Sequence, residues 1–203
     1  EEDAEAEEIE AGDSEGDAMR EGRHYNILFF DCETGGLDPR QASIIEVACV
    51  LTSPAGIVLN EYTTKVVPTK PVHPRAAAVN GYSPEKWTAA VSLAEAIGCV
   101  IDYSRDALFA AHNAPFDWAF LQDAMGSVGT RWRGGYHKID TVALAMPLLM
   151  GGHVPDLKLS TLVRHFGIDP GKAHTALSDA RACRWVFLKL MERYDPLFRG
   201  KES

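Results

Sequence analysis

Apolar residues first gather in short runs whose length and flanking turn residues indicate β-strands. The earliest run covers residues 27–30, and two more strand-like runs follow at 44–51 and 57–67. Residues 53–56, with the sequence Ser-Pro-Ala-Gly, have the composition of a hairpin loop between the second and third runs. A later apolar run at 107–111 predicts another short, buried strand.

Further along the chain the apolar spacing becomes that of helices. Between residues 91 and 102, apolar side chains recur every three or four positions, which predicts an amphipathic helix. Residues 113–115 open another helix, because a proline near the first turn gives up no needed N–H. Later helices are expected at 141–149, 159–166 and 175–193. Strands followed by helices that alternate with further short strands indicate an α/β domain with a mixed sheet.

The net charge of −9 is concentrated at the start of the chain. Residues 1–22 hold eleven acidic side chains and one Arg, whereas residues 23–203 hold 18 acidic and 19 basic side chains. The first segment lacks the apolar residues that would offset its ordering entropy, so we expect a disordered acidic tail. The sequence thus predicts one folded domain at 23–195, followed by a C-terminal tail at 196–203.

The cysteines and the lengths of the apolar runs indicate the cellular compartment in which the protein is expected. The four cysteines are Cys32, Cys49, Cys99 and Cys183. They form no close pair of the metal-binding or redox type, so reduced thiols within a core are expected, as in a cytoplasmic protein. No signal peptide is evident, and the longest apolar run, 142–150, is shorter than the about 20 residues that span a bilayer. We expect a soluble protein with no membrane partner.

Acidic side chains occupy positions where the apolar pattern predicts core residues. Side chains alternate between the two faces of a strand, so Asp31 and Glu33 share a face with Ile27 and Phe29. Both carboxylates are therefore expected at the carboxyl end of an apolar strand, where open α/β sheets bind ligands. A lone D-x-E at such a position is also common as an exposed pair of loop acids.

Two helices repeat this feature. Asp117 heads the core-facing stripe of the helix that opens at 113–115, and Asp179 heads that of the helix at 175–193. The stripes continue with Phe120, Leu121 and Ala124, and with Cys183, Val186 and Leu190. Singly, each Asp fits a helix dipole or capping role. Four acids at the ends of core-facing stripes would repel one another unless a cation lay between them, and oxygen-only ligands favour Mg²⁺ or Mn²⁺.

Three segments resemble the exonuclease motifs of the DnaQ-like, or DEDDh, 3′→5′ exonucleases. They are FFDCETGGLDP (29–39), HNAPFD (112–117) and AHTALSDA (173–180), and the stretches 72–87 and 158–168 resemble connecting segments of that family. The likeness extends from about residue 25 to residue 193. It implies a ribonuclease H-like α/β fold, a five-stranded mixed sheet flanked by helices.

The resemblance also implies roles for individual residues. The metal-binding and catalytic carboxylates would be Asp31, Glu33, Asp117 and Asp179. His174 would be the general base, while His112 is expected to orient the loop that holds Asn113. The substrate-binding residues would be Thr34, Gly35 and Leu37 beside the 3′-terminal nucleotide, and Asn113 and Phe116 along the channel. Gly35 departs from the usual motif, in which a second Thr follows Thr34. Asp140 precedes an apolar helix and is predicted to cap it.

The activity so implied is release of mononucleotides from single-stranded DNA 3′ ends with two Mg²⁺ or Mn²⁺ ions and a histidine base. Trimming of RNA 3′ ends or short oligoribonucleotides is an alternative, and a non-catalytic binding module is a third possibility. A folded part near charge neutrality fits a short single strand better than a long duplex. Arg131, Arg133 and Lys138 are candidates for steering the strand, or else ordinary surface charges. A polymerase or other replication or repair partner and a homodimer both remain open.

Overall fold

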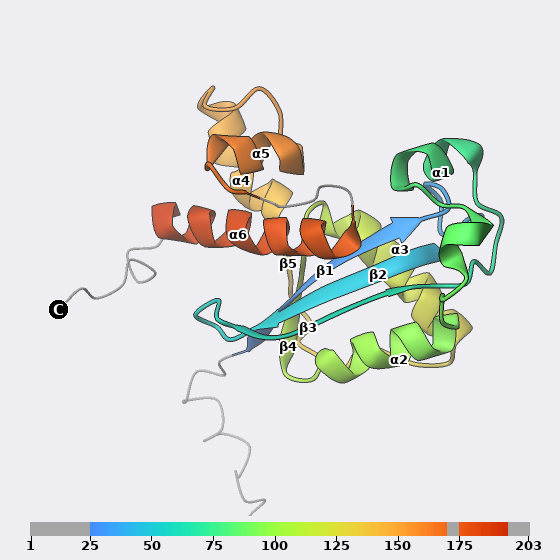
Figure 1. Ribbon diagram of the computed structural model, residues 1–203. Helices are drawn as coiled ribbons and strands as arrows, with labels where there is room; N and C mark the ends of the chain where they lie inside the picture. Colours follow the sequence, from blue (N-terminus) through green and yellow to red (C-terminus); the bar gives the residue numbers. More distant parts are fainter. Residues whose placement is uncertain (1–24, 170–174, 195–203) are drawn as a thin grey trace, which may run out of the picture.

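Five strands form one mixed sheet in the order β3-β2-β1-β4-β5 (Figure 1). The antiparallel part consists of β1 (Asn26–Thr34), β2 (Ile44–Thr52) and β3 (Val58–Lys65). The parallel part adds β4 (Ala107–Ala111) beside β1 and β5 (Lys138–Asp140) beside β4. The expected ribonuclease H-like α/β fold, with its five-stranded mixed sheet, is confirmed.

The computed structural model describes residues 25–169 and 175–194. The acidic segment 1–22, His174 and the segment 196–203 lie outside these residues, so the predictions of two tails and of a histidine base stay predictions. Within the described parts of the chain, no helix combines the length and the apolar character needed to span a membrane.

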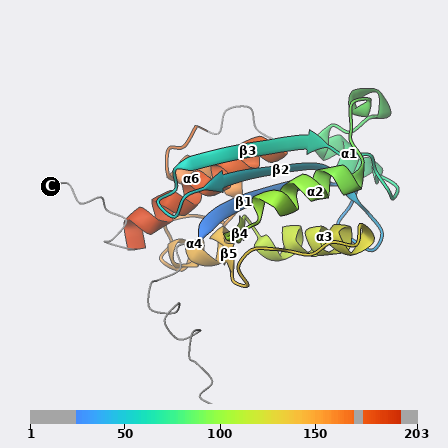
Figure 2. The same ribbon diagram turned by 90° about the horizontal axis from the view of Figure 1, so that it is seen from below.

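Helices cover both faces of the sheet (Figures 1 and 2). One face carries α2 (Leu93–Tyr103) and α3 (Ala114–Ser127). The other carries α6 (Ala176–Tyr194), against which α4 (Thr141–Met150) and α5 (Leu159–His165) pack. The short α1 (Pro74–Asn80) and the 3₁₀ turn η1 (Pro84–Trp87) lie beyond the end of the sheet, near the carboxyl end of β1.

The alternation of side chains along β1 supplies both halves of the core. Leu28 and Phe30 are fully buried on the side of α2 and α3. Ile27 and Phe29 pack on the other side with α6, where the ring of Phe29 lies 5.5 Å from that of Phe187. Because the strand continues to Thr34, longer than the apolar run predicted, its last residues keep this alternation and direct Asp31 and Glu33 toward the α6 face.

The core-facing stripe of α6 differs in part from its prediction. Cys183 packs on the sheet as expected, beside Phe29 and Ala110. Val186 and Leu190 instead join a separate cluster with α4 and α5. The helix is buried on two sides because α4 and α5 cover it, so its apolar stripe does not all face the sheet. The four cysteines are free thiols, and all but the half-buried Cys99 are buried.

Candidate active site

Three carboxylates from two elements converge at the carboxyl end of β1. Single oxygen atoms of Asp31, Glu33 and Asp179 lie within 4.8 Å of one another, and all three side chains are half-buried. Asp31 and Glu33 lie there because side chains alternate along β1. Asp179 lies there because it is in the first turn of α6, and α6 begins over this part of the sheet and runs away from it. This acidic group is the candidate metal site.

Asp117 reaches the same region from the opposite face of the sheet. It lies in the first turn of α3, is only 4% exposed, and heads a stripe whose next members, Phe120 and Leu121, are buried as predicted. Its Oδ1 accepts hydrogen bonds from the backbone amide of Cys32 at 3.2 Å and from the Cys32 thiol at 3.4 Å. Asp117 therefore adjoins the acidic group of three, although it does not belong to it by the distance above.

Strand lengths explain this contact. The β1–β4 ladder ends at Phe29 and Ala110, so β1 continues without a β4 partner beside Cys32. A buried amide there needs an acceptor, since an unpaired backbone N–H costs as much as a lost hydrogen bond. The Asp117 carboxylate, placed by the start of α3 directly after β4, supplies that acceptor.

The electrostatics of the site follow from crowding of like charges in a partly dry environment. Burial raises the pKa of Asp31 well above its usual range, and four acidic neighbours raise it further. In order of effect these neighbours are Asp117, Asp179, Glu33 and Glu46. Burial raises the pKa of Asp117 to about 7, although the hydrogen bonds from Cys32 act in the opposite direction. A bound cation would relieve this repulsion, which is what a hard-metal site of oxygen ligands requires.

Glu46 is a fifth acid at this site that the sequence patterns did not single out. It lies on β2 directly opposite Glu33 in the antiparallel register. Burial raises its pKa, while a hydrogen bond from the backbone amide of Ala176 partly offsets this effect and ties β2 to the start of α6. The signal was present, because Glu46 is the one charged residue in the apolar run 44–51.

A pocket of about 760 Å³ adjoins the acidic group, and Glu33 belongs to both. Four of the five predicted substrate-binding residues line it, namely Thr34, Gly35, Leu37 and Phe116. Leu37 is 86% exposed at the tip of the loop after β1, where an apolar side chain is available to a ligand rather than to the core. Asn113 is not among the lining residues.

The second wall of the pocket comes from residues 71–80, for which no role was predicted. The segment is bound to the loop after β1, since the amide of His73 donates to Gly35 O at 2.7 Å and Asn80 Nδ2 donates to Thr34 O at 3.1 Å. A Cβ on Gly35 would lie 3.3 Å from both Pro71 O and Val72 Cα. Gly35, where the family usually has Thr, thus permits the two walls to approach closely.

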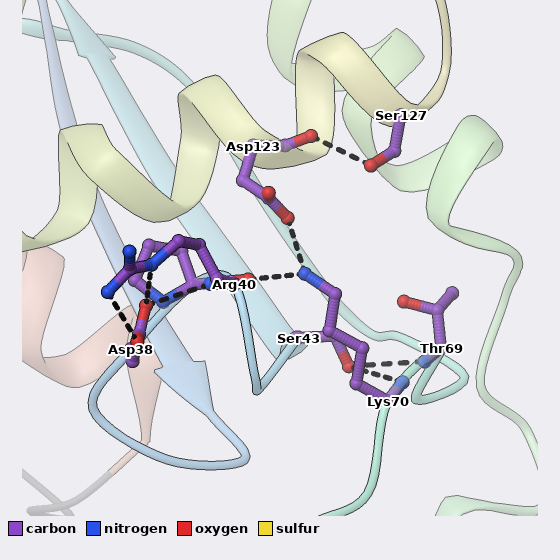
Figure 3. A network of polar contacts seen from close by, with 8 residues as sticks. Asp38, Arg40, Ser43, Thr69, Lys70, Asp123 and Ser127 are labelled. Carbon is purple, nitrogen blue, oxygen red and sulfur yellow. Dashed lines mark hydrogen bonds and ion pairs between the residues drawn. The ribbon is translucent and has the colours of Figure 1, made fainter.

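The loop after β1 is also fixed from outside by Lys70 (Figure 3). The Lys70 ammonium donates to Pro39 O and, at 2.8 Å, to Asp123 of α3. Ser43 Oγ accepts from the amides of Thr69 and Lys70 at 3.1 and 3.3 Å. The loop, the segment before α1 and α3 are therefore connected into one frame around the pocket.

The turn between β4 and α3 is held by polar contacts. His112 uses both ring nitrogens, Nδ1 with Thr141 Oγ1 and Nε2 with Leu157 O, each at 2.9 Å. Asp140 caps α4 through the amide of Val142, as predicted, and also accepts from the amide of Asn113 at 3.1 Å. Asn113 itself has a left-handed backbone, with φ of 68°. These bonds fix the point from which Asp117 reaches the site.

With this geometry in view, comparison with known proteins identifies the class. The chain matches the model of the RNase_T family, described as exonuclease, over residues 28–187. This match includes Asp31, Glu33, Asp117 and Asp179. The fold and the acidic site thus define an exonuclease domain, and the chain belongs to the DnaQ-like exonuclease family.

Individual relatives agree with this assignment. The chain is 34% identical over 167 residues to a DNA polymerase III PolC-type of Thermotoga maritima, covering 82% of this chain and 12% of that protein. It is 26% identical over 173 residues to the DNA polymerase III subunit epsilon of Treponema pallidum, covering 84% and 80%. The chain thus spans about one eighth of the PolC-type proteins and most of the epsilon subunit.

Solved structures share the fold at low sequence identity. E. coli Exonuclease I in complex with a dA16 oligonucleotide superposes with a TM-score of 0.73 at 18% identity, over 86% of this chain and 42% of that one. The Exonuclease I of Methylocaldum szegediense gives a TM-score of 0.72 at 22% identity, over 86% and 42%. At this identity the likeness establishes the fold.

Proposed function

We propose that this protein is a metal-dependent 3′→5′ exonuclease that releases mononucleotides from single-stranded DNA ends. The observation that carries the proposal is the convergence of the Asp31, Glu33 and Asp179 carboxylates within 4.8 Å, beside a pocket of about 760 Å³. The pocket lies where a strand end would bring its terminal phosphodiester to the acids. Family membership supports hydrolysis of that bond.

We propose that the carboxylates of the site hold two Mg²⁺ or Mn²⁺ ions. Among the residues that the structure describes, the acidic group offers only carboxylate oxygens, and hard divalent cations prefer oxygen. Bound there, the ions would polarise the phosphate and lower the pKa of the attacking water. We assign Asp31, Glu33, Asp117 and Asp179 as their ligands, with Asp31 central because the other acids all act on its pKa.

The remaining roles concern the strand and the proton. We assign Thr34, Gly35, Leu37 and Phe116 to the terminal nucleotide, since they line the pocket, and Asn113 to the channel at the start of α3. His174 is proposed to take the proton of the attacking water. It precedes Asp179 by five positions and lies outside the described residues. His112 is a poor alternative, because both its ring nitrogens are already hydrogen-bonded.

DNA as substrate is supported by the names of the relatives. These include a polymerase III epsilon subunit and an Exonuclease I bound to a dA16 oligonucleotide. We extend this to the present chain, with an exonuclease domain at 23–195 and a DNA polymerase as its proposed partner. An RNA substrate is the competing outcome that the experiment below separates.

The test is degradation of end-labelled single-stranded DNA, duplex DNA and RNA of one sequence, with Mg²⁺, Mn²⁺ or a chelator. We expect mononucleotides from single-stranded DNA, with loss of label from the 3′ end first and no release under chelation. His174→Ala should lower the rate about 10²–10⁴-fold, the usual scale for loss of a general base. Release of no mononucleotide under any condition would mean a non-catalytic binding module, and preferential RNA trimming would mean an exoribonuclease.

A further inference from the structure

A basic and aromatic surface lies between α3 and β5, outside the pocket. Residues 124–139 contain no acidic side chain but include Arg131, Arg133 and Lys138, together with Tyr136. We name these four residues the Tyr136 surface. All four are exposed, and Tyr136 is 86% exposed, an unusual state for a large aromatic side chain.

This surface is held in one position by its neighbours. Gly135 N donates to Ala107 O at 2.9 Å, Arg133 N donates to Ser104 Oγ at 3.3 Å, and Trp132 Nε1 donates to Gly135 O at 3.1 Å. A Cβ on Gly134 would lie 2.1 Å from Ala107 O, so this turn lies directly against the backbone at the start of β4. Tyr136 is consequently presented by a fixed backbone, which lowers the entropy cost of binding a ligand.

The ammonium group of Lys138 contacts two aromatic rings. The Lys138 ammonium lies 4.0 Å from the centre of the Trp118 ring and 5.5 Å from that of Tyr136, and it donates to Tyr136 O at 3.2 Å. Trp118 is in turn held edge-on by Phe109 and Trp132, with ring centres 5.1 and 5.5 Å away. The rings thus hold the cation beside the exposed tyrosine.

Positive charge remains on this surface after its ion pairs are considered. Arg133 contacts Asp102 at 3.4 Å, but Asp102 also contacts Arg105 at 3.7 Å, so one carboxylate serves two guanidinium groups. Together with Lys138 and Arg131 this leaves an excess of cations. Phosphates are attracted to such a surface, and bases stack on exposed aromatic rings.

The position of the surface relative to the acidic group follows from strand register. Lys138 on β5 pairs with Phe109 on β4, and Phe109 pairs with Leu28 on β1. Lys138 therefore lies two strands from β1, at the level of Leu28, which precedes Asp31 by three residues. With strands about 4.8 Å apart and a rise of about 3.3 Å per residue, the Cα atoms of Lys138 and Asp31 are about 14 Å apart. Trp118, whose ring contacts the Lys138 ammonium, directly follows Asp117 on α3, the helix that runs beside β5 in Figure 2.

We propose that the Tyr136 surface binds the DNA strand a few nucleotides upstream of the 3′ end, with a base stacked on Tyr136 and phosphates at Lys138, Arg131 and Arg133. This inference rests on the exonuclease function proposed above. In this proposal the Tyr136 surface binds the upstream part of longer strands, and the pocket alone binds the terminal nucleotide. Binding here affects affinity and leaves the bond-breaking step unchanged.

The test compares two lengths of oligothymidylate, about 3 and about 16 nucleotides, which bracket usual single-strand site sizes. For Tyr136→Ala we expect KM to rise about tenfold on the long strand, the scale of one lost base–aromatic stack. KM on the short strand and kcat on both should be unchanged. Lys138→Ala should lower the slope of log KM against log salt on the long strand by about 0.7, as for one lost phosphate contact.

Matched controls come from α6, where Trp185 is an exposed aromatic residue beside Arg184 and the Lys189 amine is paired with Glu192. Trp185→Ala and Lys189→Ala should leave both lengths unaffected, and Tyr136→Phe should retain the stack. Equal KM changes on both lengths in Tyr136→Ala, or no change on either, would overturn the proposal. Failure of the exonuclease function itself would differ, because the unmodified protein would then degrade neither strand.

Discussion

Asp117 of α3 accepts a hydrogen bond from the backbone amide of Cys32 on β1, two residues that are 85 positions apart in the chain. The contact joins the helical layer on one face of the sheet to the strand whose acids point to the other face. Together with the hydrogen-bonded turn between β4 and α3, it holds Asp117 beside the acidic group. Several expectations about activity and stability depend on this arrangement.

Removal of the thiol from Cys32 should weaken the hold on Asp117 while leaving the backbone bond in place. For Cys32→Ala we expect a several-fold lower kcat and a higher Mg²⁺ concentration at half-maximal rate, since a thiol bond is weaker than the amide bond that remains. Cys49→Ala is the matched control, because Cys49 is also a buried β-strand thiol of the same core cluster. If both variants shift the Mg²⁺ dependence equally, the thiol has no specific role.

Loss of Asp31 should separate catalysis from folding. Because burial and acidic neighbours raise the pKa of Asp31, its charge is unfavourable in the metal-free protein. We expect Asp31→Ala to abolish mononucleotide release, while its melting temperature in the presence of a chelator is equal to or above that of the unmodified protein. A sharply lower melting temperature under these conditions would contradict the repulsive arrangement.

The metal-free protein should lose stability as pH rises. The pKa of Asp117 is about 7 in the folded protein against 3.8 for an ordinary Asp, so the folded state binds more protons between these values. The unfolding free energy in chelator should therefore fall as pH increases from about 4 to about 7, by about 1.4 kcal/mol per unit of pKa shift at most. Urea denaturation at several pH values measures this slope. Asp117→Asn should reduce the slope of unfolding free energy against pH. Saturating Mg²⁺ should oppose the loss of stability as pH rises.

Gly35 should be intolerant of the residue that its family usually has there. A Cβ would lie 3.3 Å from Pro71 O and from Val72 Cα, closer than most side chains approach backbone. We expect Gly35→Thr to raise KM for single-stranded DNA and to cost about 1–3 kcal/mol of stability, as is typical of overpacking. Gly36→Ala, whose Cβ would meet a single side-chain atom of Ala42 at 3.1 Å, serves as the neighbouring control. An unchanged KM in the Gly35→Thr protein would show that the two walls separate freely.

Lys70 should act on the pocket through the loop it holds. Lys70→Met keeps the length of the side chain but removes the donors to Pro39 O and Asp123. We expect a higher KM with a smaller effect on kcat, because the loop carries Leu37 and Asp38 of the pocket lining but no carboxylate of the acidic group. Lys189→Met, which removes a lysine paired with Glu192 on α6, is the comparison. A larger loss in kcat than in KM would contradict this role.

Much of the domain was determined locally and could be predicted. The strand alternation that buries Ile27 and Phe29 also directs Asp31 and Glu33 to one face, because a period of two is a property of the backbone itself. The spacing of Asp117 from Phe120 and Leu121 likewise fixed its inward direction before any neighbour was known. The cap by Asp140 depends only on the next two residues.

Other features exist only because distant segments meet. The amide of Cys32 needs Asp117 because β4 is shorter than β1, and no local pattern contains that difference in length. Glu46 becomes part of the site through its register opposite Glu33, and the pocket acquires its second wall only when residues 71–80 fold back on Gly35. Periodicity determines which way a side chain points along its own element, whereas the neighbour it meets is set by packing across elements, which has no period in the chain.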